Sequence, residues 1–118
     1  AKAAQLGTAF LTCPEAGTSQ VHKHYLLNEQ KRKTKITKAF SGRMARGINN
    51  KFIDEMNGKQ IFPFPIQNSV TTKLRQVSQN KNNGEFINLW AGINFNKVRN
   101  LPAKELMKKL SEEFKAEI

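Results

Sequence analysis

The sequence predicts an α/β fold that is mostly helical and incomplete by itself. Apolar residues recur at helical spacing in four or five segments after residue 18. Only two segments are typical of strands, 3–11 and 35–40, and two strands without a third do not form a stable sheet. The first of these is apolar on both faces, which favours a strand buried inside a sheet. Its neighbouring strands are therefore expected outside this chain, which would make the chain part of a larger fold.

Helices are expected wherever apolar residues repeat every three or four positions. Thr18 or Ser19 can cap the first helix, and Pro102 favours the start of the last one. The turns Ser41-Gly42, Asn57-Gly58 and Asn82-Asn83-Gly84 separate the segments, and 62–65 is expected to be an extended lead-in because of its two prolines. The predicted buried stripes are Val21, Tyr25 and Leu26; Ile48, Phe52, Ile53 and Met56; Ile66, Val70, Leu74 and Val77; Phe86, Ile87, Leu89, Trp90 and Ile93; and Leu106, Met107, Leu110 and Phe114.

The charge is strongly positive, with 20 Lys and Arg against 9 Asp and Glu, a net charge of +11. Such an excess attracts polyanions, so a basic nucleic-acid-binding module is one reading. Only 31–35 is a dense basic cluster, and no aromatic residues interleave with it as a base-stacking surface would require. The charge distribution therefore favours a solvated surface, and no nucleic-acid partner is expected.

Metal and membrane functions find no support in the residues. The single cysteine, Cys13, excludes an intramolecular disulfide and a multi-cysteine metal site. His22 and His24 are two positions apart, so on a helix they point to different faces and cannot share a metal; both are expected at the surface. No apolar run approaches the roughly 20 residues of a membrane helix. A cytoplasmic location, without membrane association, is the resulting expectation.

The tetrapeptide Gln5-Leu6-Gly7-Thr8 is a candidate phosphate site. A glycine without a Cβ lets backbone N–H groups approach a phosphate, and the Thr8 hydroxyl adds a further donor. In (β/α)₈ barrels, loops after the last two strands commonly bind phosphate in this way. A tight turn with a capping threonine is the alternative for these residues taken alone.

Four blocks of the sequence resemble the nitronate monooxygenases, formerly called 2-nitropropane dioxygenases. The first is 5–17, which reads QLGTAFLTCPEAG, and the second is 37–52, which reads TKAFSGRMARGINNKF. The third is Phe64-Pro65-Ile66-Gln67-Asn68 and the fourth is Leu89-Trp90-Ala91-Gly92. The blocks occur in the family's order and cover most of the chain.

The resemblance implies an FMN-dependent enzyme built on a TIM barrel. Residues 1–17 would hold the last barrel strand and the FMN-phosphate turn, 18–100 an inserted α/β domain, and 101–118 a C-terminal helix packing back on the barrel. By the family motif, Gln5, Leu6, Gly7 and Thr8 would bind the FMN phosphate. The activity would be oxidation of an alkyl nitronate by dioxygen to a carbonyl compound and nitrite. The family's histidine near the flavin lies upstream, so no catalytic residue is assigned here, and the chain alone is expected to be inactive.

Two residues are candidates for the substrate pocket. Lys73 lies one turn beyond Ser69 on its helix and could attract an anionic nitronate; the alternative is a solvated lysine. Trp90 could lie against the flavin or anchor a core. Many relatives continue the Trp-Ala-Gly block with Gln, whereas this chain has Ile93, which puts a flavin contact there in doubt.

Arg43 and Arg46 lie beside glycines in the second block. They could attract the anionic substrate, but the preferred reading is that they stabilise the local backbone through carbonyls or carboxylates. One rival within enzymes remains open, the flavin-dependent enoyl-acyl-carrier-protein reductase, which shares the barrel and a similar Gly-Thr-x-Phe turn. The second block favours the nitronate enzyme.

Overall fold

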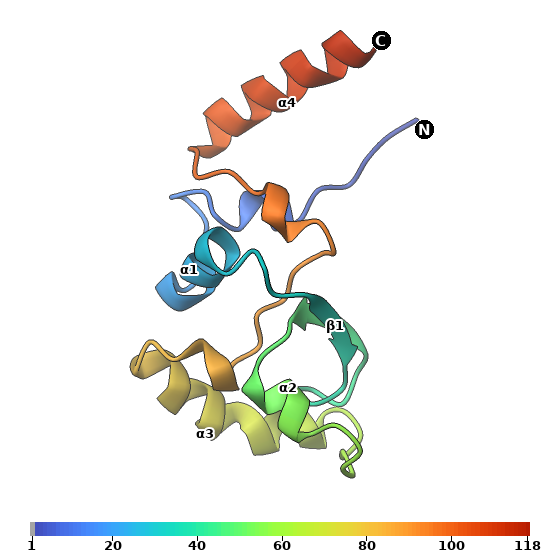
Figure 1. Cartoon of the computed structure of the whole chain (residues 1–118), viewed down its shortest axis with the longest axis vertical. Helices are drawn as coiled ribbons and strands as arrows, with labels where there is room; N and C mark the ends of the chain where they lie inside the picture. The colour runs from blue at the N-terminus through green and yellow to red at the C-terminus, as the bar shows by residue number, and fades with distance from the viewer. Residues whose placement is uncertain (1) are drawn as a thin grey trace.

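The protein is an elongated α/β molecule in which a small sheet lies between two groups of helices (Figure 1). The structure is a computed structural model and describes residues 2–118. It measures 48 × 31 × 25 Å. The helix α4 (Ala103–Glu117) and the N-terminal segment lie at one end, and the helices α2 (Lys51–Glu55) and α3 (Ile66–Asn80) lie at the other. Helix α1 (Gln20–Asn28) and the hairpin of β1 (Thr34–Thr37) and β2 (Ala45–Ile48) occupy the middle.

The expected first strand is not formed within this chain. Residues 2–6 adopt no regular structure and are exposed, and Thr8–Phe10 form the short 3-10 helix η1. A strand needs a hydrogen-bonded neighbour, and the described residues place none beside this segment. The prediction of a strand over 3–11 is therefore wrong for this chain.

The hairpin is partly as predicted, with one strand that the sequence reading missed. The strand expected over 35–40 is β1, which ends at Thr37, so Phe40 is buried beyond the strand and Ile36 is half exposed. Ile48, expected on a helix, lies on β2 and pairs with Thr34. The helix expected from Ile48 to Met56 is shorter in the structure, where α2 begins after its N-cap Asn50.

The expected short helix around Trp90 is instead an extended segment beside β2. The amide of Ile48 donates to the Leu89 carbonyl at 2.8 Å, and that of Ala91 donates to the Arg46 carbonyl at 3.1 Å. Ile87, Leu89 and Ala91 are buried at every second position, which is strand periodicity. Gly47 allows this approach, because a Cβ there would lie 2.9 Å from the Leu89 carbonyl oxygen. Only the 3-10 turns η2 (Gly84–Phe86) and η3 (Phe95–Lys97) flank the segment.

The core is assembled mainly from α1, β2 and this extended segment. Ser19 caps α1 by accepting a hydrogen bond from the His22 amide, as expected for one of the two candidate caps. The helix buries its predicted stripe. The buried cluster consists of Val21, Tyr25, Leu26, Ile48, Ile87, Leu89, Ala91 and Phe95, with Leu11 and Val98 against it.

Helix α3 is present as predicted but is held by polar side chains rather than by its apolar stripe. The Gln67 amide donates to the Ala39 carbonyl at 2.7 Å, and the Thr71 hydroxyl donates to the Phe40 carbonyl at 2.6 Å. Buried carbonyls beyond the end of β1 require donors, so the helix turns this polar face inward. The four stripe residues Ile66, Val70, Leu74 and Val77 remain 38–59% exposed.

Helix α4 buries only Leu106 of its predicted stripe. Leu110 is half-buried, and Met107 and Phe114 are 56% and 68% exposed. The reason is that, apart from an ion pair between Arg99 Nη2 and Glu113 Oε1 at 2.7 Å, α4 meets the remainder of the molecule near its first turns. There the Glu15 carboxylate accepts a hydrogen bond from the Ala103 amide at 3.1 Å, which caps a helix that lacks a capping side chain of its own.

Candidate functional site

The four residues of the predicted phosphate site line one cavity. It has a volume of about 490 Å³ and lies between the N-terminal segment, the residues after Gly92 and the start of α4. Gln5, Leu6, Gly7 and Thr8 line it on one side. Ile93, Lys97 and Arg99 are among the residues opposite. The cavity therefore combines the predicted tetrapeptide with Lys97 and with Arg99, whose guanidinium forms an ion pair with Glu113 at 2.7 Å.

The backbone at Gly7 and Thr8 leaves donors available to this cavity. Residues 8–10 form η1, whose first bond runs from the Phe10 amide to the Gly7 carbonyl at 3.0 Å. The amides of Gly7, Thr8 and Ala9 donate to no acceptor among residues 2–118. A Cβ on Gly7 would meet nothing within 4 Å, so the space in front of this backbone is open. Such a turn leaves N–H groups free for an acceptor in the cavity that Gly7, Thr8 and Ala9 line.

Thr8 connects this turn to the fourth sequence block. Its Oγ1 accepts a hydrogen bond from the Gly92 amide at 2.9 Å, across 84 positions of sequence. The hydroxyl hydrogen remains available to donate, since the bond uses only a lone pair. The sequence reading missed this contact because it placed Gly92 at the end of a helix. The alternation of Ile87, Leu89 and Ala91 was the signal for an extended segment.

The two candidate substrate residues do not join this cavity. Trp90 forms an isolated bridge with Gly47, and its ring meets Phe40 edge-on with centroids 5.8 Å apart. Lys73 is exposed on α3, at the other end of the molecule in Figure 1, and forms no ion pair with any residue from 2 to 118. Lys73 therefore does not line the cavity formed by the four residues of the predicted phosphate site.

The two arginines of the second block have structural contacts, but with an aromatic ring and a hydroxyl rather than with the expected carbonyls or carboxylates. The Arg43 guanidinium lies over the Phe64 ring, 3.8 Å from its centroid. Arg46 donates from Nη1 to the Thr34 hydroxyl at 3.1 Å, across the hairpin. Arg43 thus connects the hairpin to the segment at Phe64, and Arg46 connects the two strands of the hairpin.

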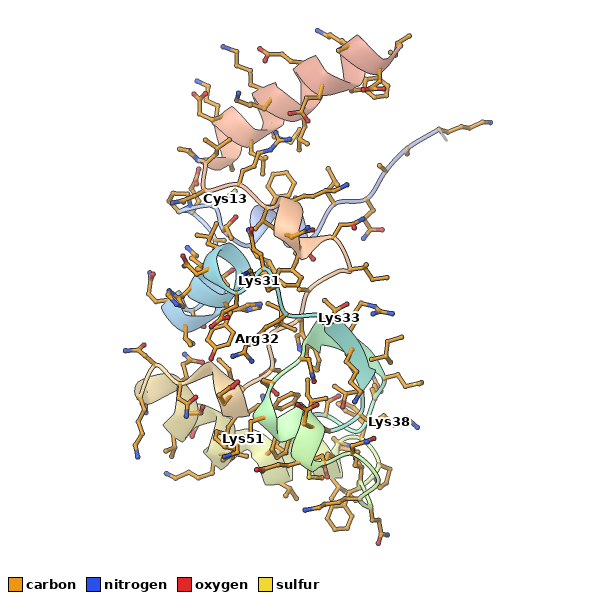
Figure 2. The ribbon with its side chains drawn as sticks, in the orientation of Figure 1. Cys13, Lys31, Arg32, Lys33, Lys38 and Lys51 are labelled. Atoms are coloured by element: carbon orange, nitrogen blue, oxygen red, sulfur yellow. The ribbon has the colours of Figure 1, made fainter. Side chains whose placement is uncertain are left out.

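The basic residues are spread over several elements. Figure 2 shows Lys31, Arg32 and Lys33 along the connection from α1 to β1, with Lys38 and Lys51 lying apart from them. Arg32 is neutralised, since Nη1 lies 2.8 Å from Glu85 Oε1 and Nε lies 3.4 Å from Glu29 Oε2. Within residues 2–118 no group of three or more His, Cys, Asp or Glu side chains could hold a metal ion. No helix of this range combines the length and apolarity needed to cross a bilayer.

His22 is half-buried rather than fully exposed at the surface. Its Nε2 lies 3.1 Å from the Trp90 carbonyl oxygen. Because a carbonyl can only accept, Nε2 carries the proton and Nδ1 is the acceptor in the neutral ring. Burial lowers the pKa of His22 from its ordinary value of 6.5, since the low-dielectric surroundings oppose the charged form. His24, by contrast, is exposed as expected.

This burial predicts a loss of stability in acid that depends on His22. When the folded-state pKa is lowered, the unfolded chain binds more protons below about pH 6.5, so the free energy of unfolding falls as the pH falls. Between about pH 7.5 and about pH 5, the wild type should lose more unfolding free energy than His22→Gln, whose amide can still donate to Trp90. Urea denaturation at both pH values measures this. His24→Gln is the matched control and should behave as the wild type; equal losses in all three proteins would contradict the prediction.

Comparison with known proteins assigns the chain to a family. A family model described as nitronate monooxygenase matches residues 1–113. A probable nitronate monooxygenase of Staphylococcus aureus strain Newman is 39% identical over 109 residues, which cover 91% of this chain and 31% of that protein. One from Staphylococcus saprophyticus has the same identity and coverage.

A solved structure agrees with the sequence relatives. It is described as nitroalkane oxidase from Streptomyces ansochromogenes, is 36% identical, and superposes with a TM-score of 0.89 over 94% of this chain and 32% of its own. The chain thus spans about a third of the length of the curated relatives it matches. The chain belongs to the nitronate monooxygenase family.

Proposed function

We propose that this chain is the C-terminal part of an FMN-dependent enzyme that oxidises alkyl nitronates with dioxygen to carbonyl compounds and nitrite. In this proposal residues 1–17 carry the last barrel strand and the FMN-phosphate turn, 18–100 the inserted domain, and 101–118 the helix that returns to the barrel. The family membership and the names of the relatives support it. A contact between the two outer parts supports the division, because the Glu15 carboxylate caps α4 by accepting from the Ala103 amide.

The single observation that carries the proposal is the open turn at Gly7 and Thr8. Three consecutive amides without acceptors and a threonine hydroxyl with a hydrogen to donate suit the oxygens of a phosphate monoester. Lys97 lines the same cavity and adds positive charge, whereas Arg99 also lines it but is paired with Glu113, its Nη2 lying 2.7 Å from Glu113 Oε1. Gln5 and Leu6 border the turn and would contact the rest of the phosphate end. The residues present therefore fit the phosphate of FMN.

Catalysis in the proposed enzyme would be shared between this chain and a barrel portion that it lacks. The flavin would supply the electron carrier for oxidation of the nitronate. This chain would hold the phosphate through Gly7 and Thr8 and thereby position the cofactor, since a site must be held in place to be effective. No catalytic residue is assigned in residues 1–118, and the base is proposed to come from the missing barrel portion.

We place Lys73 and Trp90 on the substrate side of the complete enzyme. Lys73 is an exposed cation without an ion pair in the described chain, which suits an anionic nitronate. Trp90 is only half-buried, so part of its ring remains available for contact. The partners are thus a small anionic nitronate, dioxygen and the missing barrel portion, and neither nucleic acid nor membrane is expected. A cytoplasmic location stays a prediction of the sequence.

Gly7→Val should abolish stable flavin binding in the complete enzyme. A suitable protein is a chimera in which this chain replaces the matching segment of the S. aureus relative. The side chain would fill the space before the Gly7 and Thr8 amides and keep a phosphate away from them. It should not disturb the fold, because Gly7 has φ −112° and nothing within 4 Å of a Cβ. Flavin absorbance after gel filtration, relative to protein, measures the loss.

Two controls make the result specific. Gly17→Val, at another glycine with open space around its Cβ, should retain flavin. The unsubstituted 118-residue chain should neither bind FMN nor release nitrite from a nitronate, because contacts to the ring are proposed to lie on the barrel. Stoichiometric FMN in the Gly7→Val chimera would remove the phosphate site from the proposal, and turnover by the chain alone would show that the barrel is unnecessary.

A further inference from the structure

A second polar cleft lies between the start of α1 and the side of α3 and shares no residue with the Gly7 cavity. Its volume is about 710 Å³. Neutral amide and hydroxyl side chains from α3, together with Ser19 and Asn88, form most of its lining. Arg75 and His22 are the basic groups in the lining, and no carboxylate lines the cleft. A cavity of this composition is suited to an anion.

Arg75 is held in a fixed position without any acidic partner. Its Nε donates to the Thr71 hydroxyl at 3.2 Å, and its Nη2 donates to the Asn68 carbonyl at 2.9 Å and to Asn68 Oδ1 at 3.1 Å. All these acceptors are neutral and lie on the same helix. Burial lowers the pKa of Arg75, in keeping with a guanidinium that has lost water and gained no carboxylate.

One edge of this guanidinium is available. Nη1 of Arg75 has no hydrogen-bond partner among residues 2–118. A guanidinium that is already immobilised loses little further conformational freedom on binding an anion. The positive end of the α1 dipole reaches the same cleft, because Ser19 is its cap and lines the cleft, and the first turn of α1 contains no acidic residue.

The uncharged polar side chains that line the cleft indicate what kind of group the ligand carries besides its anion. Gln76, Gln79, Asn80 and Asn88 each offer both a donor and an acceptor, as Thr72 does with its hydroxyl. None of these side chains except that of Thr72 has a hydrogen-bond partner among the described residues. Groups that both donate and accept match the hydroxyls of a ligand better than an apolar body.

We propose that this cleft binds a small hydroxylated oxyanion of the sugar-phosphate type, with Arg75 Nη1 binding the anionic group and the amides of α3 binding the hydroxyls. Inorganic phosphate, glucose 6-phosphate and glucose are suitable probes, since they separate the anion from the hydroxyls. Isothermal titration of the 118-residue chain should show glucose 6-phosphate binding more tightly than phosphate, and glucose more weakly than either.

Four variants test the role of Arg75. Arg75→Gln removes the cation and should weaken glucose 6-phosphate binding roughly tenfold or more, as loss of a charge-assisted hydrogen bond does. Gln76→Glu keeps Arg75 but places a carboxylate in the cleft, and it should weaken binding similarly. As controls, Lys81→Gln removes a cation and Gln60→Glu adds a carboxylate at positions outside the cleft. Both control variants should bind glucose 6-phosphate as the wild type does.

Circular dichroism shows whether each variant is folded. Arg75 bonds only within α3, so its replacement should leave the fold intact, and Gln76 is exposed. Unchanged binding in either cleft variant, an equal loss in the two controls, or no binding of glucose 6-phosphate to the wild type would overturn the proposal. None of these outcomes bears on the Gly7 turn, because flavin retention by the chimera is measured separately.

Discussion

Replacing Gly42 with alanine is expected to cost most of the stability of the chain. Gly42 has φ +92°, a conformation that residues with a Cβ rarely adopt. A Cβ there would lie 2.5 Å from the Phe64 amide nitrogen, 2.8 Å from the Phe62 carbonyl oxygen and 2.8 Å from the Pro63 carbonyl carbon. All three are backbone atoms, so no side chain can rotate away. Backbone strain and overpacking each cost roughly 1–3 kcal/mol, so a loss of about 3–5 kcal/mol is expected.

Urea denaturation followed by Trp90 fluorescence measures this loss. Trp90 is the only tryptophan, and its ring contacts Phe40 two residues before Gly42, so its emission reports on this region. Gly58→Ala is the matched control, because Gly58 has φ +78° but nothing within 4 Å of a Cβ. It should lose only about 1 kcal/mol, from strain alone. Equal losses of unfolding free energy in Gly42→Ala and Gly58→Ala would show that the close approach of residues 62–64 to Gly42 does not contribute to the loss.

Asn50→Ala should destabilise the chain by a similar amount through loss of buried hydrogen bonds. Asn50 is 2% exposed, and its Oδ1 caps α2 by accepting from the Ile53 amide at 3.2 Å. Its Nδ2 donates to the Gly84 carbonyl at 3.0 Å and to the Ile87 carbonyl at 2.8 Å. Loss of a cap costs about 1 kcal/mol, and each buried carbonyl left without a donor costs roughly 1–3 kcal/mol. The expected total is about 3–5 kcal/mol.

Two further variants separate the contribution of the α2 cap from that of the two hydrogen bonds that Asn50 Nδ2 donates. Asn83→Ala removes an exposed cap, in which the side chain accepts from the Glu85 amide at 2.9 Å, and should cost about 1 kcal/mol or less. Asn50→Asp keeps the capping oxygen but turns a carboxylate toward two carbonyls, so it should remain as unstable as Asn50→Ala. A stable Asn50→Asp protein would show that the bonds to Gly84 and Ile87 contribute little.

The sequence alone was informative where local chemistry decides structure. Ser19 caps α1, Gly42 and Gly58 take positive φ at turns, and Asn82 does so between α3 and η2. Helical spacing located α1, α3 and α4 to within a few residues. These features depend on residues within one or two turns of each other, so a linear reading contains the necessary information.

The sequence was misread wherever a neighbour distant in sequence decides the conformation. The segment 86–93 was taken for a helix, but hydrogen bonds with β2 make it extended. Ile48 fits both a helical stripe and a strand, and only pairing with β1 distinguishes them. The segment 3–6 has the composition of a strand yet forms none, because no partner lies beside it in the described chain. Short apolar runs suit either structure, and tertiary context selects one.

By itself, the sequence determined the family, since its four blocks occur at their positions without any structure, and it predicts which tetrapeptide could meet a phosphate. Tertiary structure alone decided how these parts meet. It brought the Gly92 amide to the Thr8 hydroxyl across 84 positions, and it placed the half-buried His22 against the Trp90 carbonyl. It also turned the polar face of α3 inward and left the apolar stripe outside. The reason is that backbone groups find hydrogen-bond partners wherever the fold places them, and the sequence does not show which distant group will provide them.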